Sequence, residues 1–535
     1  MKEIFRNSGE ILYELPVFMN GVLRIRASGA AREIVCSCGP FRDFIIFRHS
    51  LTETREGAAF VYTAKRLLTA RYIRIECADT RGVTAAFEEI LFPGKPVGRF
   101  RCEDPLLTRV YETSARTVER CILPHRFGNS SIEFQSETSR RFAAEWRGAQ
   151  DDWVIMDGAR RDREVWVGDL LYECRTAWYV YGDGGIIKNT FAAILDQIDG
   201  CGNIAASSIS MQTFYEYNCW FIIVFYEYVR MSGDRAYWLE QKDVLIRILN
   251  RIVDLTGGGP LVLGRRQTWA WTSGRSGALT GSNCVYYKAL LCMAELLESG
   301  SAAEKYGSLA RALKAEIRKA FDEKGQCYLD AIGGERYALD ACALAVCFGV
   351  SEGEEARRVL ASVKAKFRSK AGFLLFSPKE EPDGQNWVHN DHVWPFVNTI
   401  LLEAFLKCSL FADAYELIAG VWGGMLDKGA ETFWEIIDGD TGGFMPRRLT
   451  ERSDDCDTWN SECHGWSAGL PQLIAEYVLG VKPAASAGGR PVCAPVYGGD
   501  FSLTLPVEQD VWEITREKGR IRYKKLGKPN EGSLA

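Results

Sequence analysis

Four acidic residues lie within one short, arginine-rich segment of the sequence, between positions 157 and 169. The segment reads DGARRDREVWVGD, and its charged and aromatic members are Asp157, Arg160, Arg161, Asp162, Arg163, Glu164, Trp166 and Asp169. Carboxyl groups brought close together repel one another, which favours the protonated form of one of them, whereas adjacent arginines stabilise the anions. Such a segment can therefore supply a carboxylic acid that donates a proton.

The local conformation decides which of these side chains face the same way. If a helix starts at residue 162, Asp162, Trp166 and Asp169 share one face, so two carboxylates and an indole line one wall. If residues 161–165 are extended, Asp162 and Glu164 point the same way, and either is a candidate for the acid. A surface cluster of paired Arg and Asp is the simpler alternative. The ring of Trp166 favours a sugar site instead, because sugars are commonly held by aromatic rings and carboxylates.

A second acid, Glu435, follows Trp434 and lies 273 residues after Asp162; its part in this chemistry is what the resemblance of residues 422–435 to a glycosidase family implies. Cleavage of a glycosidic bond needs one carboxylic acid to protonate the leaving oxygen and a second carboxylate on the other side of the sugar. Only a closed arrangement of helices would bring two such distant side chains face to face. Trp434 would provide an apolar wall beside the second acid.

Several other residues have both a functional and a structural interpretation. Trp269 and Trp271 are either a stacking wall for a sugar or core aromatic residues. His389 and His392 lie close together but lack a third spaced ligand, so we expect loop hydrogen bonding or cavity lining and no metal. His464, taken alone, is typical of a buried or helix-capping histidine, and its position after the second acid favours a binding role.

The acidic segment resembles the signature of the α-L-rhamnosidases of glycoside hydrolase family 78. In that signature an acid, a stretch ending in Arg-Asp-Arg or Asp-Glu-Arg, a Trp and Gly-Asp recur in this order. Residues 422–435, WGGMLDKGAETFWE, resemble the family's second signature, which ends in Thr, an aromatic or apolar residue, Trp and Glu. His464, in SECHGW, matches the later histidine of the family. The resemblance covers most of the chain, including the order of a β segment, a helical toroid and a second β segment.

This resemblance implies roles for individual residues. Asp162 corresponds to the general acid and Glu435 to the general base of an inverting enzyme, and the chemistry needs no cofactor. The substrate-binding residues that we expect are Asp157, Arg161, Trp166, Asp169, Trp271, Trp434 and His464. Two positions depart from the family pattern: Asp162 stands where many members have Glu, and Ala270 replaces an acid. The second departure indicates that the sugar specificity can differ from rhamnose.

The composition narrows the class of partner. The chain has 535 residues, 65 Lys plus Arg against 70 Asp plus Glu, and a formal charge of −5. This small net charge, with 47% hydrophobic residues, excludes a disordered chain. The longest cationic runs, such as Arg160-Arg161 and Lys524-Lys525, are too short for a nucleic-acid surface. We therefore expect a small glycoside or oligosaccharide as substrate, whereas the oligomeric state does not follow from the sequence.

The cysteines and the apolar runs indicate the compartment. The 17 Cys include no CxxC pair and no compact Cys/His cluster, so neither a disulfide framework nor a zinc site is expected. The first residues lack the apolar core of a secretory signal, and no stretch reaches the roughly 18 apolar residues of a membrane span. The sequence therefore predicts a cytoplasmic protein with mostly reduced thiols and no membrane partner.

The elements that must position these residues fall into three blocks. Residues 1–98 alternate apolar and polar positions, as in 22–27 and 72–77, and predict a small N-terminal β-sandwich. Residues 99–480 have a helical period, and 481–535 return to alternation, which predicts a small C-terminal β-domain. The expected helices are 104–121, 169–182, 185–198, 213–232, 236–255, 284–298, 303–321, 336–349, 353–367, 393–407, 410–421 and 466–479.

A dozen helices in one block favour two concentric layers of hairpins, in which inner helices bury both faces and outer helices bury one. The predicted fold class is mainly α, an (α/α)6 toroid (six-hairpin) flanked by the two β segments. Two alternative functions stay open. One is another six-hairpin glycosidase or a phosphorylase, and an Arg/Lys anion pocket with no base opposite Asp162 would indicate the phosphorylase. The other is a non-catalytic sugar-binding protein, which the loss of one carboxylate would indicate.

Overall fold

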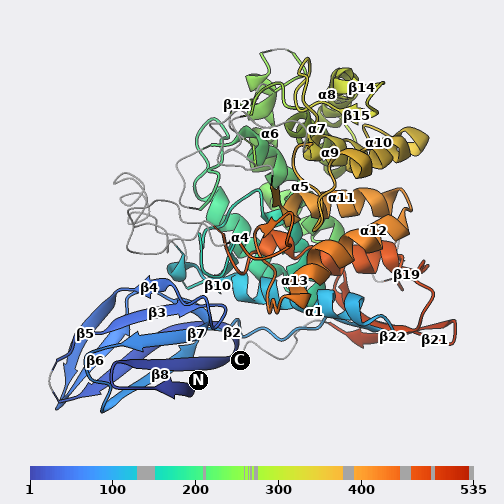
Figure 1. Ribbon diagram of the computed structural model, residues 1–535. Coiled ribbons are helices and arrows are strands. Elements are labelled where there is room, and N and C mark those ends of the chain that lie inside the picture. Colours follow the sequence, from blue (N-terminus) through green and yellow to red (C-terminus); the bar gives the residue numbers. More distant parts are fainter. Residues whose placement is uncertain are drawn as a thin grey trace.

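Strands occupy the two ends of the chain, and helices occupy the block between them (Figure 1). The computed structural model describes residues 1–29, 31–128, 151–208, 213–257, 259–262, 264–265, 268–269, 275–377, 391–445, 460–482 and 489–528. Helices account for 41% of the residues and strands for 27%. The expected class, mainly α, is therefore too narrow, because the end blocks contribute long strands such as the 19-residue β2 (Glu10–Ser28).

The N-terminal strands form an eight-stranded antiparallel sheet of order β4-β3-β7-β2-β6-β5, and β1 and β8 also pair with β2. The other strands are β1 (Lys2–Arg6), β3 (Val35–Gly39), β4 (Phe47–His49), β5 (Leu51–Glu56), β6 (Ala59–Ala64), β7 (Leu68–Glu76) and β8 (Val83–Glu89). The first half of β2 pairs with β1 and β7, and its second half pairs with β6 and β8. Leu23 and Ile25 enter a core separate from that of the helices, whereas Arg24 and Arg26 are exposed. The alternation predicted for residues 22–27 is therefore confirmed.

Alternate helices of the central block contact one another in a closed cycle, in the order α3, α5, α7, α9, α11, α14 and back to α3. They are α3 (Leu170–Tyr181), α5 (Tyr215–Ser232), α7 (Thr280–Leu297), α9 (Leu339–Cys347), α11 (Pro395–Lys407) and α14 (Leu470–Leu473). Every residue of α3 and of α9 is buried, as expected for helices that are covered on both faces.

Six longer helices pack outside this cycle. They are α1 (Pro105–Cys121), α4 (Gly184–Leu195), α6 (Arg235–Leu255), α8 (Ser301–Ile317), α10 (Gly353–Lys366) and α12 (Phe411–Ile418). Four of them lie mainly against one inner helix, α1 contacts both α3 and α14, and α6 contacts both α5 and α7. In α10 the buried residues, Ala356, Val359, Leu360 and Val363, form a single stripe. The predicted helices are thus confirmed, although the predicted 410–421 and 466–479 continue through π-helical turns at Ala419–Gly423 and Ile474–Val478.

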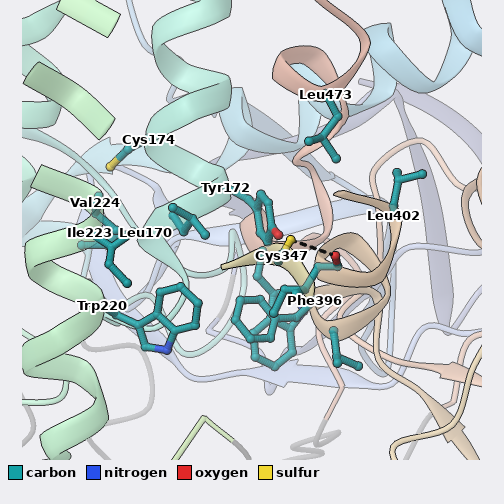
Figure 2. Packing of buried hydrophobic residues seen from close by; sticks show 14 of the residues in the cluster. Leu170, Tyr172, Cys174, Trp220, Ile223, Val224, Cys347, Phe396, Leu402 and Leu473 are labelled. Carbon is teal, nitrogen blue, oxygen red and sulfur yellow. Dashed lines mark hydrogen bonds between the residues drawn. The ribbon is translucent and has the colours of Figure 1, made fainter. Parts of the chain in front are cut away.

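Large aromatic side chains from different inner helices meet at the centre of the cycle. Tyr172 of α3 and Trp220 of α5 both contact Phe396 of α11, with ring centroids 6.1 and 6.2 Å apart (Figure 2). Cys347 Sγ at the end of α9 donates a hydrogen bond to the Ile400 carbonyl of α11 at 3.5 Å. No helix within the described ranges is both long enough and apolar enough to cross a membrane.

The C-terminal strands β20 (Phe501–Val507), β21 (Asp510–Glu517) and β22 (Arg520–Gly527) pair in sequence. The other edge of β20 pairs with β9 (Arg99–Cys102), which directly precedes α1. Leu503 and Ile514 belong to the same core as the helices. This sheet therefore contains one strand from before the first helix and three strands from after the last one. The pairing of β9 with β20 could not be predicted, because a strand of four residues leaves too short a pattern in the sequence.

Candidate active site

The acid-rich segment is a loop that connects β11 (Trp153–Ile155) to α3. β11 pairs with β10 (Ile122–Pro124), which directly follows α1. A helix starting at residue 162 would be wrong, because α3 begins at Leu170. The backbone of Arg163 has a φ of 59°, in the left-handed region that an α-helix excludes. The shared helical face of residues 162, 166 and 169 is therefore not formed.

Asp157 organises this loop from within. Its two carboxylate oxygens accept the backbone N–H groups of Asp162 at 2.9 Å and Glu164 at 3.0 Å. The side chain is buried. Burial and the charge of Asp162 raise the pKa of Asp157 to about 7. The charge of His464 and the bond from the Glu164 N–H favour the anion of Asp157, but they do not outweigh the first two effects. The structure thus places Asp157 as an anchor for the backbone that carries Asp162.

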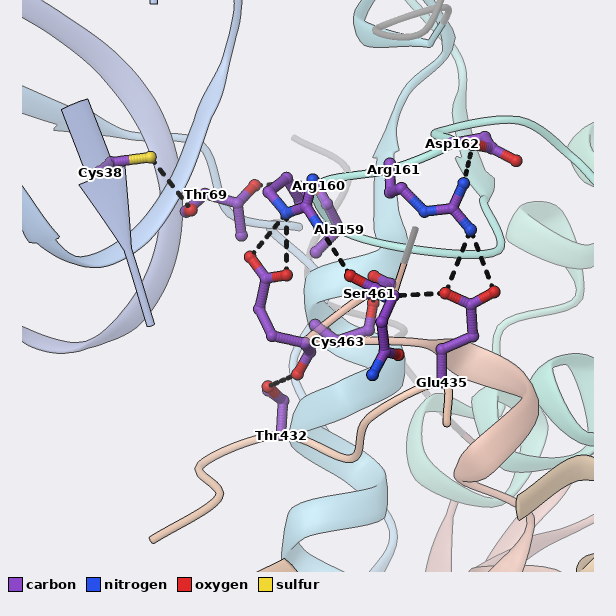
Figure 3. A network of polar contacts seen from close by, with 12 residues as sticks. Cys38, Thr69, Ala159, Arg160, Arg161, Asp162, Thr432, Glu435, Ser461 and Cys463 are labelled. Carbon is purple, nitrogen blue, oxygen red and sulfur yellow. Dashed lines mark hydrogen bonds and ion pairs between the residues drawn. The ribbon is translucent and has the colours of Figure 1, made fainter. Parts of the chain in front are cut away.

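The two expected catalytic acids meet through one guanidinium group. Arg161 Nη1 donates to Asp162 Oδ1 at 2.7 Å, and its Nη2 donates to both oxygens of Glu435 at 3.0 and 3.1 Å (Figure 3). Burial opposes the charge on Arg161, but Asp162 and Glu435 raise its pKa above the ordinary value. The fixed width of a guanidinium fork limits the distance between Asp162 Oδ1 and Glu435 Oε1 to about 8 Å at most.

Glu435 is held in place from the opposite side of the site. Its Oε2 accepts the backbone N–H of Ser461 at 2.7 Å, and its own N–H donates to the Ser461 carbonyl at 2.9 Å. The side chain of Glu435 is 7% exposed and that of Asp162 is 23% exposed. Asp162 is therefore the more accessible of the two carboxyl groups.

Asp169 and His464 form a buried ion pair next to these acids. Asp169 occupies the N-cap position of α3 but makes no capping bond, and its Oδ1 lies 3.1 Å from His464 Nε2. Burial opposes a charge on His464, but Glu435 and Asp169 raise the pKa of His464 to about 9. Burial raises the pKa of Asp169, although the bond to His464 favours its anion. A cationic imidazole thus lies close to Glu435.

The rival acid Glu164 has a different partner from Asp162. Ser207 Oγ donates to Glu164 Oε2 at 2.5 Å, and the side chain is buried. Trp166 is partly exposed, and its ring meets Tyr217 edge-on with centroids 6.5 Å apart. Asp162, which binds Arg161, and Glu164 therefore take part in separate contacts.

The expected aromatic residues lie in different surroundings. Trp434 is buried and packs edge-on against Phe41 and Phe444, with centroids 5.9 and 5.5 Å apart. Trp269 donates its Nε1–H to Asp340 at 2.9 Å. Trp271 lies outside the described residues, so its role stays a prediction.

Several contacts at the site were not apparent from the sequence. Trp466 contacts His464 with ring centroids 4.6 Å apart and donates its Nε1–H to the Glu435 carbonyl at 3.2 Å. Arg160 forms a buried ion pair with Glu462 at 2.8 Å. The sequence singles out His464 within Ser461–Trp466, but the contacts of Trp466 with Glu435 and of Glu462 with Arg160 leave no local pattern.

The residues described here contain no group of three or more His, Cys, Asp and Glu arranged to hold a metal ion. His392 lies 3.3 Å from Asp391, whereas His389 falls outside the described ranges. The protein groups at the site are carboxylates, the guanidinium groups of Arg160 and Arg161, the imidazole of His464 and aromatic rings. Such a set can transfer protons to and from a bound sugar without a metal ligand set.

No protein-family model matches the sequence, and no curated protein matches it. Solved structures are nevertheless similar. A GH78 family rhamnosidase of Bacillus sp. GL1 aligns with a TM-score of 0.71 and 18% identity, over 98% of this chain and 52% of that enzyme. A Klebsiella oxytoca rhamnosidase with rhamnose bound aligns with a TM-score of 0.64 and 16% identity, over 89% of each chain.

A Streptomyces avermitilis α-L-rhamnosidase complexed with L-rhamnose aligns with a TM-score of 0.64 and 14% identity, over 99% of this chain and 49% of that enzyme. The chain thus spans about half the length of the Bacillus and Streptomyces enzymes. Identities below one fifth carry information on the fold rather than on the substrate. The chain therefore has the fold of the GH78 α-L-rhamnosidases.

Proposed function

We propose that this protein is an inverting glycoside hydrolase, an α-L-rhamnosidase that releases terminal L-rhamnose from small glycosides or oligosaccharides. The observation that carries the proposal is the shared guanidinium of Arg161, which brings Asp162 and Glu435 together although they are 273 residues apart. The similarity in fold to α-L-rhamnosidases supports a glycoside hydrolase, and the choice of sugar rests on the resemblance of residues 157–169 and 422–435 to the signatures of that family.

In this mechanism Asp162 protonates the glycosidic oxygen, and Glu435 removes a proton from the attacking water. The distance limit of about 8 Å is compatible with the roughly 6.5–9.5 Å that separates the carboxyl groups of inverting glycosidases, and the proposal of inversion itself rests on the resemblance of the two sequence signatures to the family. The greater exposure of Asp162 suits contact with a leaving group that extends towards solvent. Glu435, held by Ser461 and Arg161, is fixed in orientation, as a base requires.

The sugar would lie against the charged groups next to these two acids. Asp169 and His464 supply a carboxylate and an imidazolium for ring hydroxyls, and charge-assisted hydrogen bonds are the strong ones. Trp166, partly exposed, supplies an aromatic face. We assign Asp157 to positioning the loop, because both of its oxygens are engaged by backbone N–H groups.

We further propose that the closed cycle of helices is an (α/α)6 toroid and that the domain boundaries are those expected from the sequence. Residues 1–98 would then form an N-terminal β-sandwich domain, 99–480 the catalytic toroid and 481–535 a C-terminal β-domain. The separate core of the N-terminal sheet supports the first boundary. The closed order of contacts among the inner helices supports the toroid.

The test is a screen of chromogenic aryl glycosides that includes the α-L-rhamnoside, with the anomer of the first product followed by NMR. We expect hydrolysis of the α-L-rhamnoside and a product of inverted configuration. Activity that appears only with inorganic phosphate would identify a phosphorylase. Calorimetric binding of L-rhamnose without turnover of any glycoside would identify a sugar-binding protein. A Glu435→Gln variant should bind the sugar but not turn it over.

A further inference from the structure

A cavity of about 260 Å³ lies beside the segment that carries Glu435 and has no role in the mechanism above. Four aromatic rings and one ammonium group line it, from Phe41, Phe44, Lys428, Trp434 and Phe444. Trp434 is buried, whereas the three phenylalanines are partly exposed. Sites for complete drug-sized ligands usually enclose roughly 300–1,000 Å³, so this aromatic cavity suits one part of a ligand rather than a whole one.

Two turns of the backbone hold the rings of the aromatic cavity. Phe44 donates its backbone N–H to the Phe41 carbonyl at 3.0 Å, so the turn between β3 and β4 carries one ring at each end. On the other wall, Phe444 pairs with Ile437, which lies two residues after Glu435. The Phe444 ring meets the Phe44 ring edge-on, with centroids 5.8 Å apart, and lies 6.3 Å from the Phe41 ring. Contacts within the protein therefore determine the shape of the cavity.

The aromatic cavity is close to both segments that carry the proposed catalytic acids. Trp434 directly precedes Glu435, and consecutive Cα atoms are about 3.8 Å apart. On the side of the acid-rich loop, the guanidinium carbon of Arg160 lies 3.9 Å from the Phe47 ring centroid, and that ring lies 5.8 Å from the Phe44 ring. The groups proposed to hold the sugar lie next to the start of α3, whereas the cavity lies next to the N-terminal sheet. A group attached to the sugar is therefore the part of a substrate that can reach the cavity.

The side chains that line the cavity favour an aromatic group over a second sugar. They include two hydrogen-bond donors, Lys428 and Trp434, but no acceptor. The hydroxyl groups of a sugar would lose the acceptors that water offers, which costs free energy, whereas an aromatic ring needs none and gains from edge-on contact with other rings. Lys428 is exposed and forms no ion pair within the described ranges, so its ammonium can donate to an acidic oxygen on such a ring.

We propose that the aromatic cavity binds the leaving group of the substrate, and that this group is an aromatic ring that carries a carboxylate or a second phenolic oxygen. Phe44 and Phe444 hold the ring, and Lys428 binds the acidic oxygen. The inference rests on the proposed function and narrows its substrates to aryl glycosides. The N-terminal sheet thereby takes part in substrate selection, because the turn between β3 and β4 supplies Phe41 and Phe44.

The first test compares kcat/KM for the methyl, phenyl and 4-carboxyphenyl glycosides of the sugar that the screen identifies. Each ratio between two glycosides is divided by the wild-type ratio, which removes the intrinsic reactivity of the leaving groups. Phe44→Leu stays apolar but loses the ring, so its phenyl-to-methyl ratio should fall about fivefold. Lys428→Gln should lower the 4-carboxyphenyl-to-phenyl ratio about threefold. The control is Phe5→Leu, at an exposed phenylalanine of the same sheet, which should change neither ratio.

The second test needs no turnover. Saturation-transfer NMR should detect the ring protons of 4-hydroxybenzoate on the wild type and on Phe5→Leu, and the signals should weaken on Phe44→Leu. Equal signals on the wild type and Phe44→Leu, unchanged kinetic ratios, or an equal fall for a disaccharide of the same sugar would each overturn the inference. Lys428→Gln alters only an exposed side chain, so it remains informative if Phe44→Leu fails to fold. A wild type that binds 4-hydroxybenzoate in this pattern but cleaves no glycoside would contradict the proposed function and support the aromatic site.

Discussion

The guanidinium of Arg161 is shared by the two carboxyl groups that we assign to catalysis, and this sharing limits where each can move. Its Nη1 contacts Asp162 and its Nη2 contacts Glu435. Removing one partner from such a buried pair leaves an uncompensated charge, which is why the three side chains act as a unit. A lysine at position 161 would present a point charge and could not hold both acids in this geometry.

At the residue scale, the two carboxyl groups should respond differently to substitution. A general acid contributes roughly 10²–10⁴-fold to the rate when the leaving group is poor. Asp162→Asn should therefore lose about that much kcat on a natural aglycone and much less on an activated aryl glycoside, which needs little protonation. The measurement is kcat on both substrates. Suppose instead that Asp162→Asn loses the same kcat on both substrates, whereas Glu164→Gln loses much more on the natural aglycone than on the aryl glycoside. Glu164 would then be the general acid.

His464 gives a prediction about stability and pH. Its pKa in the folded protein, about 9, lies above the ordinary 6.5, so its protonated form stabilises the fold. By linkage this contribution amounts to about 3 kcal/mol, is fully present below pH 6.5 and is lost as the pH rises through about 9. The difference in unfolding free energy between wild type and His464→Gln, from urea titrations, should therefore shrink between pH 6 and pH 10.

The control for that measurement is His125→Gln. Burial lowers the pKa of His125 to about 4, so this imidazole is neutral throughout the same pH interval. The stability difference between the wild type and this variant should not change from pH 6 to pH 10. A difference for His464→Gln that is equally flat would contradict a protonated His464.

At the scale of elements, the loop at residues 157–169 depends on Asp157. Its two oxygens accept two backbone N–H groups, whereas an amide has only one acceptor oxygen. Asp157→Asn should therefore lower the unfolding free energy by about 1–3 kcal/mol and should reduce kcat more than it raises KM. Urea titration and steady-state kinetics measure both quantities.

Asp183→Asn is the matched control for the loop anchor. Asp183 caps α4 through a single oxygen, which accepts the N–H of Gly185 at 2.8 Å. Because Asn caps helices as well as Asp does, this variant should keep its stability. A rise in KM with unchanged kcat and stability in Asp157→Asn would show that Asp157 holds the sugar, as the family resemblance implies.

The hydrophobic periodicity of the sequence predicted the helices and the N-terminal strands well, because burial of one or both faces of an element produces a regular spacing of apolar residues. The positions of α3 and α5 and the alternation in β2 are examples. Local patterns could not show that the loop before α3 wraps around Asp157, since that conformation depends on contacts with Ser207, Ser208 and Cys463. The motifs identified Asp162 and Glu435, but Arg161 as their common partner appears only in three dimensions.

At the scale of the whole molecule, the N-terminal sheet contacts the acid-rich loop directly. Thr69 on β7 accepts a hydrogen bond from Arg163 Nη2 at 2.8 Å, and its Oγ1 lies 2.7 Å from the Ala159 carbonyl. Arg160 stacks on Phe47 of β4, with its guanidinium carbon 3.9 Å from the ring centroid. The residues on either side of Arg161 are thus fixed by the sheet, which gives this sheet a part in positioning the two acids that we propose as catalytic.

This coupling predicts that a conservative change in the sheet impairs catalysis. Thr69→Val keeps the shape of the side chain but removes the oxygen that contacts Arg163, whose buried guanidinium would lose one of its acceptors. The unfolding free energy should fall by about 1–3 kcal/mol, and kcat should fall with it because residues 159–163 lose their support. Thr54→Val, on the exposed strand β5, should change stability by less than about 0.5 kcal/mol and leave kcat unaltered. If Thr69→Val lost stability while kcat at a temperature well below its melting point stayed at the wild-type value, the sheet would stabilise the chain without positioning the acids.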